Sequence, residues 1–320
     1  MSSNKDFGFS TEADEVATYF EQEIRGKTVL ITGCTLGGLG FEAARVVSKH
    51  HAGLVILAGR KQEAIDEAIQ KIKAEAPSAN LRSLVVDLAS LESVRHAAAE
   101  VNTYPEVIDV LINNAGIMAS PYHTTKDGLE GQFGINHVGP FLFTNLILPK
   151  ILASKTGAPR IVNVSSIGHI LAPILFDDPS FDNGKSYNKW WAYGQSKTAN
   201  MLFTHELAKR YKFHGLVALS LHPGGIQTNL GRDMTAADAL EPVTDYQGNV
   251  IDITDFTPKT IPQGTSTHIV AAFDPSIASQ SGSYLVDCQL AMDHAKPYAI
   301  DDTQADRLWK LSEKIVGQNF

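Results

Sequence analysis

Short apolar runs alternate with longer amphipathic segments along most of the chain. The runs are rich in Val, Ile and Leu and lie at 28–32, 54–58, 84–86, 107–112, 161–164 and 217–221. Between them, apolar residues recur every three or four positions, as in 64–72, which predicts helices. Strands that are apolar throughout are buried on both faces, so the alternation predicts a parallel sheet. With right-handed crossovers this is an α/β fold, a doubly wound, mainly parallel sheet with helices on both faces.

We expect this Rossmann-like sheet to form a single domain at 26–320, with a polar N-terminal arm at 1–25. In the arm, a helix predicted at 11–24 places four apolar side chains on one face: Val16, Tyr19, Phe20 and Ile24. This face predicts an arm that docks on the domain, and a disordered tail is the alternative.

Two irregular segments interrupt the alternation, at 176–191 and 226–262. Long loops in compact α/β domains commonly bind ligands, so we expect both to be substrate loops. The first is rich in aromatic residues, which favours a bulky apolar substrate, although local packing explains them equally well. A helical tail is predicted around Trp309–Ile315.

Composition excludes several classes of protein. The formal net charge of −8 argues against a nucleic-acid partner. The longest apolar run, Leu54–Ala58, is far too short to span a membrane, and no apolar signal core stands at the N-terminus. Cys34 and Cys288 are the only cysteines, which favours free thiols in a reducing compartment, and we expect a cytoplasmic protein. No cluster of His, Cys, Asp and Glu has the spacing of metal ligands, so we infer no metal site. The sequence leaves open whether the protein forms a homodimer.

The first strand is followed by a glycine-rich turn, Gly33-Cys34-Thr35-Leu36-Gly37-Gly38-Leu39-Gly40. Glycines let a backbone approach a pyrophosphate closely, and the following helix offers unpaired N–H groups to it. We therefore expect cofactor contacts from Gly33, Thr35, Gly38, Leu39 and Gly40. A plain strand-to-helix turn is the alternative, but the position early in the chain favours a dinucleotide.

The second strand ends in Gly59-Arg60-Lys61, where an NAD site needs a carboxylate for the ribose 2′-hydroxyl. Two cations at a helix start are unfavourable unless an anion binds there. The 2′-phosphate of NADP is such an anion, so Arg60 and Lys61 predict NADP(H) as the cofactor, with solvated surface cations as the alternative.

The third and fourth strands end in further candidate cofactor contacts. Asp87, followed by Leu88, can accept from an adenine amino group or cap the next helix. The fourth strand ends in Asn114, Ala115 and Gly116, which are small enough for cofactor contact or can tie strands together through the amide.

Tyr193 and Lys197 are four residues apart in a predicted helix and therefore share one face. A nearby ammonium lowers the pKa of a phenol, and the pair can then exchange the proton that accompanies hydride transfer. Ser165 and Ser166 follow the strand at 161–164, where a hydroxyl can hold a carbonyl oxygen. Asn136 interrupts a helical region, and its amide can kink the helix and order a water. An exposed helix pair is the alternative for Tyr193 and Lys197.

Together these motifs identify the chain as resembling the short-chain dehydrogenase/reductase family over about residues 26–290, in its retinol-dehydrogenase-like and WW-domain-oxidoreductase-like branch. The resemblance implies that Tyr193 is the general acid in reduction, that Lys197 lowers its pKa and binds the nicotinamide ribose, and that Ser166 orients the carbonyl. It implies further that Asn136 holds a relay water and that Gly33, Gly38 and Gly40 cradle the pyrophosphate. Pro223, Gly224 and Thr228 would lie by the nicotinamide.

The sequence departs from the family pattern twice. The glycine turn is one residue longer than usual, unless Gly37 takes the place of Gly38. The C-terminal strand lacks the usual Asp-Gly-Gly and ends in Asp287-Cys288-Gln289, so the usual tetramer is not assumed.

The resulting hypothesis is NADPH-dependent reduction of an apolar small-molecule ketone or aldehyde, with alcohol oxidation as the reverse. A catalytically silent NADP-binding regulator or scaffold is the alternative, although it would have no chemical need for Tyr193, Lys197, Ser166 and Asn136 together. A nucleotide-sugar epimerase on the extended fold would need a large C-terminal lobe. A hydrolase would need a Gly-x-Ser-x-Gly elbow, which the sequence lacks.

Overall fold

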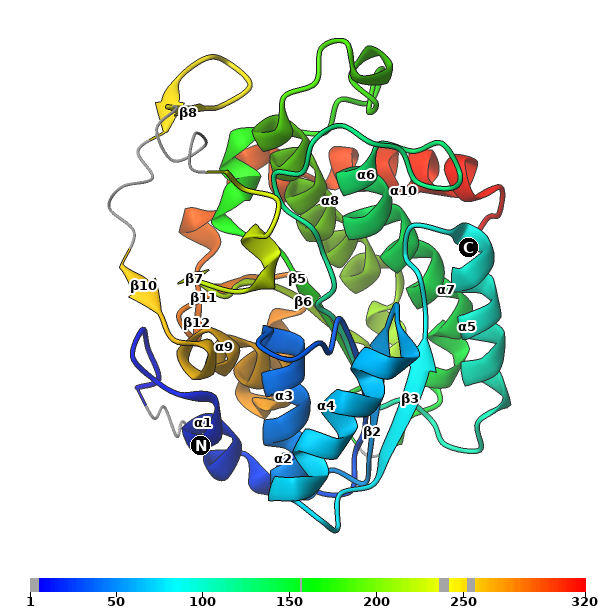
Figure 1. Cartoon of the computed structure of the whole chain (residues 1–320), viewed down its shortest axis with the longest axis vertical. Coiled ribbons are helices and arrows are strands. Elements are labelled where there is room, and N and C mark those ends of the chain that lie inside the picture. Colours follow the sequence, from blue (N-terminus) through cyan, green and yellow to red (C-terminus); the bar gives the residue numbers. More distant parts are fainter. Residues whose placement is uncertain (1–5, 156, 236–241, 252–256) are drawn as a thin grey trace.

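The protein is described by a computed structural model covering residues 6–155, 157–235, 242–251 and 257–320. One eight-stranded sheet forms its centre, with the order β12-β11-β6-β5-β4-β1-β2-β3 (Figure 1). All pairs in it are parallel except β11 with β12. This confirms the predicted α/β class. The strands are β1 Thr28–Thr32, β2 Leu54–Gly59, β3 Leu81–Val85, β4 Val110–Asn113, β5 Arg160–Val164, β6 Val217–His222, β11 Tyr284–Val286 and β12 Gln289–Leu290.

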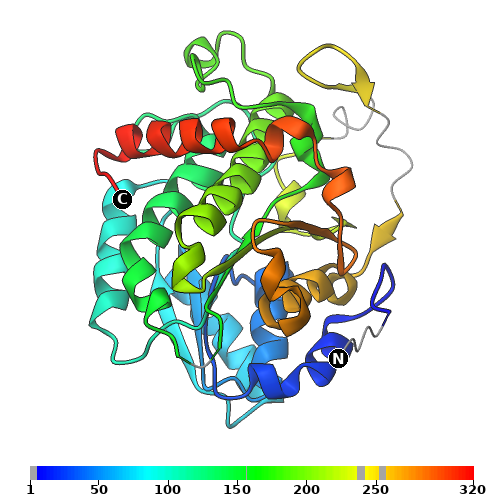
Figure 2. The same cartoon turned by 180° about the vertical axis from the view of Figure 1, so that it is seen from behind.

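Helices cover both faces of the sheet. One face buries apolar residues of α3 Leu39–Lys49, α4 Gln62–Glu75 and α9 Ile261–Phe273. The other face buries those of α5 Leu91–Thr103, α7 Gly139–Leu152, α8 Lys189–Arg210 and α10 Asp302–Val316. Seen from behind, α10 lies across α8 (Figure 2). The short α6, Gly131–Phe133, precedes α7. This layering buries the inner strands β1, β2, β4, β5 and β6 on both faces, as their apolar sequences require.

The strand order reverses between β1 and β4. From β1 the chain proceeds outward to β2 and β3, and from β4 it proceeds the other way to β5, β6 and β11. The loops that follow β1 and β4 therefore diverge to opposite faces and leave a crevice at the carboxyl edge of the sheet. The glycine turn and Asn114–Gly116 flank this point.

The loop after β6 carries small paired strands: β7 Gly225–Ile226 with β10 Pro258–Lys259, and β8 Val243–Thr244 with β9 Val250–Ile251. Residues 236–241 and 252–256 of the expected substrate loop 226–262 lie outside the described residues. In the β11–β12 turn, Asp287 and Cys288 have φ of 50° and 66°, a conformation that favours glycine. Two residues other than glycine therefore adopt this conformation at the end of β11.

The single helix expected at 11–24 is two helices, α1 Ala13–Tyr19 and α2 Glu21–Ile24, separated at Phe20. The Phe20 ring meets the Tyr19 ring edge-on, with centroids 4.9 Å apart, and lies tilted against the Phe7 ring at 6.1 Å, where the chain turns. The arm is docked: α1 packs on α9 and buries Val16 completely. The boundary at residue 25 stays a prediction.

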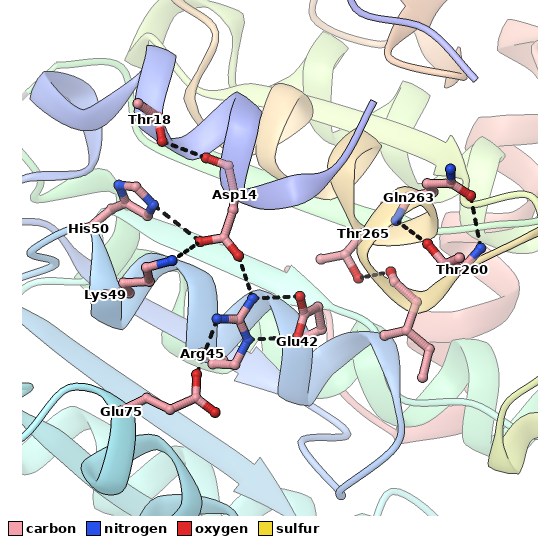
Figure 3. A network of polar contacts seen from close by, with 11 residues as sticks. Asp14, Thr18, Glu42, Arg45, Lys49, His50, Glu75, Thr260, Gln263 and Thr265 are labelled. Carbon is pink, nitrogen blue, oxygen red and sulfur yellow. Dashed lines mark hydrogen bonds and ion pairs between the residues drawn. The ribbon is translucent and has the colours of Figure 1, made fainter. Parts of the chain in front are cut away.

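Asp14 on α1 fastens the arm to α3 (Figure 3). Its carboxylate binds Arg45 at 2.6 Å and Lys49 at 2.8 Å, and lies 3.4 Å from His50. Arg45 also binds Glu42 at 2.7 Å and Glu75 at 3.3 Å. Burial raises the pKa of Asp14, but hydrogen bonds and charge from Lys49 and Arg45 outweigh it and lower the pKa to about 2.

We predict that Asp14→Asn lowers the free energy of unfolding at pH 6 by about 1 kcal/mol or less, because a third of the side chain is exposed. The folded pKa lies below the ordinary value, so the stabilisation exists above about pH 4 and is lost as pH falls through about 2. Urea unfolding between pH 6 and about pH 2 measures it, with the exposed Glu67→Gln as the control. A difference between wild type and Asp14→Asn that stayed constant with pH would contradict this account.

Candidate active site

Tyr193 and Lys197 lie one turn apart on α8 and are both buried, with 4% and 3% of their surface exposed. The Lys197 ammonium donates to the carbonyl of Val164, the last residue of β5, at 3.0 Å. Its nitrogen lies 5.5 Å from the centroid of the Tyr193 ring. An exposed surface pair, the alternative for this motif, is therefore wrong, and the two side chains lie together at the carboxyl edge of the sheet.

The two serines after β5 point to different partners. Ser165 Oγ donates to the carbonyl of Lys197 at 2.8 Å and so holds α8 against the strand. Ser166 hydrogen-bonds the Tyr193 side chain, and its Oγ also accepts from the Gly168 amide at 3.0 Å. The structure thus brings the second serine, rather than the first, to the phenol.

Burial dominates the electrostatics of the pair. It raises the pKa of Tyr193 to about 12, against a smaller opposite effect of the Ser166 hydrogen bond. It lowers the pKa of Lys197 to about 8. The net pKa of Tyr193 thus lies above its ordinary value, because desolvation of the phenol is the largest effect, and the predicted lowering by Lys197 stays a prediction. Tyr193 keeps its proton at neutral pH.

Asn136 lies in a π-helical turn, Gly134–Val138, between α6 and α7. Its amide donates to the Ile117 carbonyl and to Ser196 Oγ, both at 2.9 Å, and accepts from the Ile117 amide at 2.8 Å. Both amide donors are thus used within the protein, and the predicted ordering of a water by Asn136 stays a prediction. Asn136 ties the loop after β4 to α8. Gly116 packs here too, since an added Cβ would lie 3.1 Å from Asn136 Oδ1 and 3.6 Å from Lys197 Nζ.

The glycine turn packs directly on the end of β4. An added Cβ at Gly33 would lie 2.8 Å from Ala115 Cα, and one at Gly40 would lie 2.5 Å from Asn114 Nδ2. The Asn114 amide donates to the Thr32 carbonyl at 2.9 Å, so it links the two strands. Any side chain at Gly33 or Gly40 would push the turn away from this strand end.

Gly37, and not Gly38, has the left-handed conformation in this turn, with φ of 74°. An added Cβ at Gly37 would meet only Asn229 Nδ2 at 3.9 Å, so this backbone is open to an approaching group. Gly38 is the N-cap of α3 with an extended backbone, and its amide donates to the Thr35 carbonyl at 3.1 Å. Of these two glycines, only Gly37 has the backbone conformation that favours glycine, and the assignment of the family role to Gly38 stays a prediction. Leu39 is the first residue of α3.

Arg60 and Lys61 lie at the start of α4, next to the end of β2, and both are exposed. Lys61 is the N-cap residue of α4 and makes no capping bond. Neither cation has a hydrogen bond or ion pair within the described part of the chain. Because this end of a helix attracts negative charge, the two side chains can hold a phosphate there.

Asp87 lies two residues beyond β3 and has two partners of its own. One carboxylate oxygen accepts from the Ala89 amide at 3.1 Å, and the other lies 3.5 Å from Lys126 Nζ. Ser90, and not Asp87, is the N-cap of α5, so the predicted capping alternative is wrong. Leu88 is buried, and its carbonyl lies 2.6 Å from where a Cβ on Gly139 would be.

The turn after β6 lies beside the glycine turn, because Asn229 Nδ2 donates to the Leu36 carbonyl at 3.1 Å. Gly224 follows Pro223 with φ of 101°, and an added Cβ would lie 2.7 Å from Lys259 Cδ. Thr228 caps the short turn Asn229–Gly231 through its hydroxyl. Lys259 itself was not predicted: its buried ammonium pairs with Asp287 under the Phe9 ring. A lysine in a long polar loop gives no sequence signal of such burial.

The aromatic residues of 176–191 line two cavities on different sides of α8. Tyr187 and Trp190 line one cavity of about 390 Å³, together with Ala119, Pro121, Tyr122 and Asp233. Trp190 is one turn before Tyr193 on the same face of the helix. Phe176, Phe181 and Trp191 instead line one of about 570 Å³, whose wall includes Leu202. Trp191 and Leu202 are three turns apart and lie on the side of α8 away from Tyr193. Among the described residues, Tyr193 itself lines neither cavity.

Comparison with known proteins agrees with this architecture. A family model described as short chain dehydrogenase matches residues 27–175. Retinol dehydrogenase 13 of Homo sapiens is 39% identical over 294 residues, which are 92% of this chain and 86% of that protein. The chloroplastic short-chain dehydrogenase TIC 32 A of Brassica napus is 36% identical over 318 residues, 97% of this chain and 94% of that one. A crystal structure of a protein from Mycobacterium paratuberculosis is 32% identical with a TM-score of 0.71, covering 93% and 96% of the two chains.

The chain belongs to the short-chain dehydrogenase/reductase family. Within it, the relatives place the chain in the retinol-dehydrogenase-like branch. It is therefore an oxidoreductase that acts on an alcohol or carbonyl group. None of the helices in the described ranges has both the length and the apolar character needed to cross a membrane.

Proposed function

We propose that the protein reduces apolar aldehydes or ketones with NADPH, with Tyr193 as general acid, Lys197 and Ser166 beside it, and the reverse oxidation as the minor direction. The observation that carries this proposal is the arrangement of three buried side chains. Ser166 contacts the Tyr193 phenol, and the Lys197 ammonium lies 5.5 Å from the centroid of the Tyr193 ring. Reduction needs a phenol that still holds its proton, and burial raises the pKa of Tyr193 to about 12.

The residues at the crevice fit a dinucleotide. Gly33 and Gly40 keep the turn tight against β4, Gly37 leaves its backbone open, and the start of α3 supplies unpaired N–H groups. We assign further cofactor contacts around the same crevice to Thr35, Gly38, Leu39, Asn114–Gly116 and the turn with Pro223, Gly224 and Thr228. We assign Asp87 and Leu88 to the end that would hold the adenine. When bound, NADPH supplies the hydride, and we assign its 2′-phosphate to Arg60 and Lys61.

In this mechanism the chain's own residues bind and protonate the carbonyl oxygen. Ser166 Oγ and the Tyr193 hydroxyl lie together and can both donate to that oxygen. As negative charge grows on it, Tyr193 gives up its proton. The neighbouring ammonium of Lys197 stabilises the phenolate that remains. Asn136 keeps α8 and the loop after β4 in register while this occurs.

The cavity beside Trp190 favours a substrate with an apolar body. Its volume of about 390 Å³ and its aromatic walls suit a hydrophobic molecule, such as the retinoid in the name of the relatives. We also place this activity in the cytoplasm, since the thiols of Cys34 and Cys288 are free and buried. A screen of apolar aldehydes and ketones with NADPH, followed by its absorbance and run in parallel with NADH, tests the proposal. Tight NADPH binding with no turnover would favour the silent regulator instead.

We predict that Tyr193→Phe lowers kcat by about 10²- to 10⁴-fold, because the acid that protonates the carbonyl oxygen is lost. NADPH affinity, measured by titration calorimetry, should stay within a few-fold of wild type. Tyr104→Phe removes a phenol that bonds Glu100 far from the site and serves as the matched control. Full turnover in Tyr193→Phe would refute the assignment of Tyr193.

We predict that Arg60→Ala weakens NADPH binding by about 10- to 100-fold, because a charge-assisted bond to the 2′-phosphate is lost. NADH binding should hardly change. Lys71→Ala removes an equal charge from an exposed position further along α4. It controls for the loss of one positive charge without the loss of a phosphate contact. If both cofactors lost affinity equally, Arg60 would not be the residue that distinguishes them.

A further inference from the structure

His169 lies three residues after Ser166, and main-chain groups hold both of its ring nitrogens. Nδ1 lies 2.8 Å from the Ser166 carbonyl oxygen, and Nε2 lies 3.2 Å from the amide nitrogen of Lys296. An amide N–H can only donate, so Nε2 accepts and Nδ1 carries the ring proton. The residue is completely buried, and burial lowers its pKa to about 4, so the ring is neutral.

The ring is part of the turn that presents Ser166. The Ser166 carbonyl accepts both from the ring and from the His169 amide, the latter at 3.2 Å. Gly168 within the turn packs on the catalytic phenol, since an added Cβ would lie 2.7 Å from Tyr193 Cε1. Ser166, the turn and the Tyr193 ring therefore form one packed unit.

The other side of His169 belongs to the chain after the sheet. Besides the Lys296 amide, Tyr298 contributes its hydroxyl, which donates to the His169 carbonyl at 2.8 Å. Both residues lie between β12 and α10, in the part of the chain that follows the family-like strand β11. The Lys296 side chain is exposed, so its amide makes the direct contact with the ring, while its ammonium acts on the ring only through its charge.

We propose that His169 is a positioning residue, which fixes the direction of the Ser166 hydroxyl by clamping the Ser166 carbonyl to the C-terminal segment. This inference rests on the proposed function of Ser166 as a ligand of the substrate carbonyl. The ring acts only as a neutral bridge, donating on one side and accepting on the other. The segment 294–298 thus completes the catalytic site without contacting substrate.

Lys296→Pro tests the bridge because it removes the N–H and places the proline Cδ against the His169 ring instead. Lys296 has φ of −65° and ψ of 140°, which proline adopts, and Ala295 before it has φ of −80° and ψ of 132°, which proline requires of its predecessor. Lys296→Ala is the matched control, because it loses the same side chain and keeps the N–H. We expect kcat to fall about five- to thirtyfold in Lys296→Pro with the KM for NADPH unchanged, and to stay at the wild-type value in Lys296→Ala.

A second variant guards against misfolding. His169→Asn keeps a donor near the position of Nδ1 and loses the acceptor, so it should resemble Lys296→Pro, whereas His169→Phe loses both and should be the slowest. Nitrogen-15 NMR of histidine-labelled wild-type protein should show a protonated Nδ1 and an accepting Nε2, and the Nε2 signal should shift in Lys296→Pro.

The outcomes separate the two claims. An unchanged kcat in Lys296→Pro beside an active wild type, or a wild-type ring protonated on Nε2, would overturn the role of His169 and leave the proposed function standing. A wild type that turns over none of the carbonyl compounds would overturn the proposed function, and the role of His169 with it.

Discussion

The contact between α8 and the carboxyl end of β5 is the constraint on which the site depends. Lys197 and Asn200 both donate to the Val164 carbonyl, at 3.0 and 3.1 Å, while Ser165 donates back to the Lys197 carbonyl. These three bonds fix both the height and the rotation of the helix against the sheet. Because these bonds hold α8 in this position, the phenol of Tyr193 is buried beside Ser166. A rotation of α8 by one residue would remove the phenol from the crevice.

The rest of the crevice follows from the topology of a parallel sheet. Every loop that follows a strand emerges at the same edge, and the reversal of strand order between β1 and β4 opens a gap there. The glycine turn, Asn114 and the exposed cations of α4 are far apart in sequence and meet at this edge. Docking of the arm on α3 and α9 then holds the helix that carries the glycine turn from its outer side (Figure 3).

The features that sequence reasoning could predict are those with a fixed period or spacing. Apolar runs predicted the strands to within a few residues, and four-residue spacing placed Tyr193 and Lys197 on one face. Features set by tertiary contacts were not accessible in this way. The close approach of Gly33 and Gly40 to Asn114 depends on tertiary packing, the pKa of Tyr193 depends on burial, and the helix break at Phe20 lies where aromatic rings meet. The bridge through His169 joins residues 127 positions apart, and no local pattern indicates it.

Transfer of deuterium from NADPH labelled at the reactive position of the nicotinamide tests the central claim most directly. The protein is mixed with the labelled cofactor and each apolar carbonyl compound, and the products are analysed by mass spectrometry. The account predicts an alcohol that carries one deuterium on the carbon of the former carbonyl, formed by wild-type protein and not by Ser166→Ala. Alcohol without deuterium, or deuterated alcohol formed equally by Ser166→Ala, would contradict it.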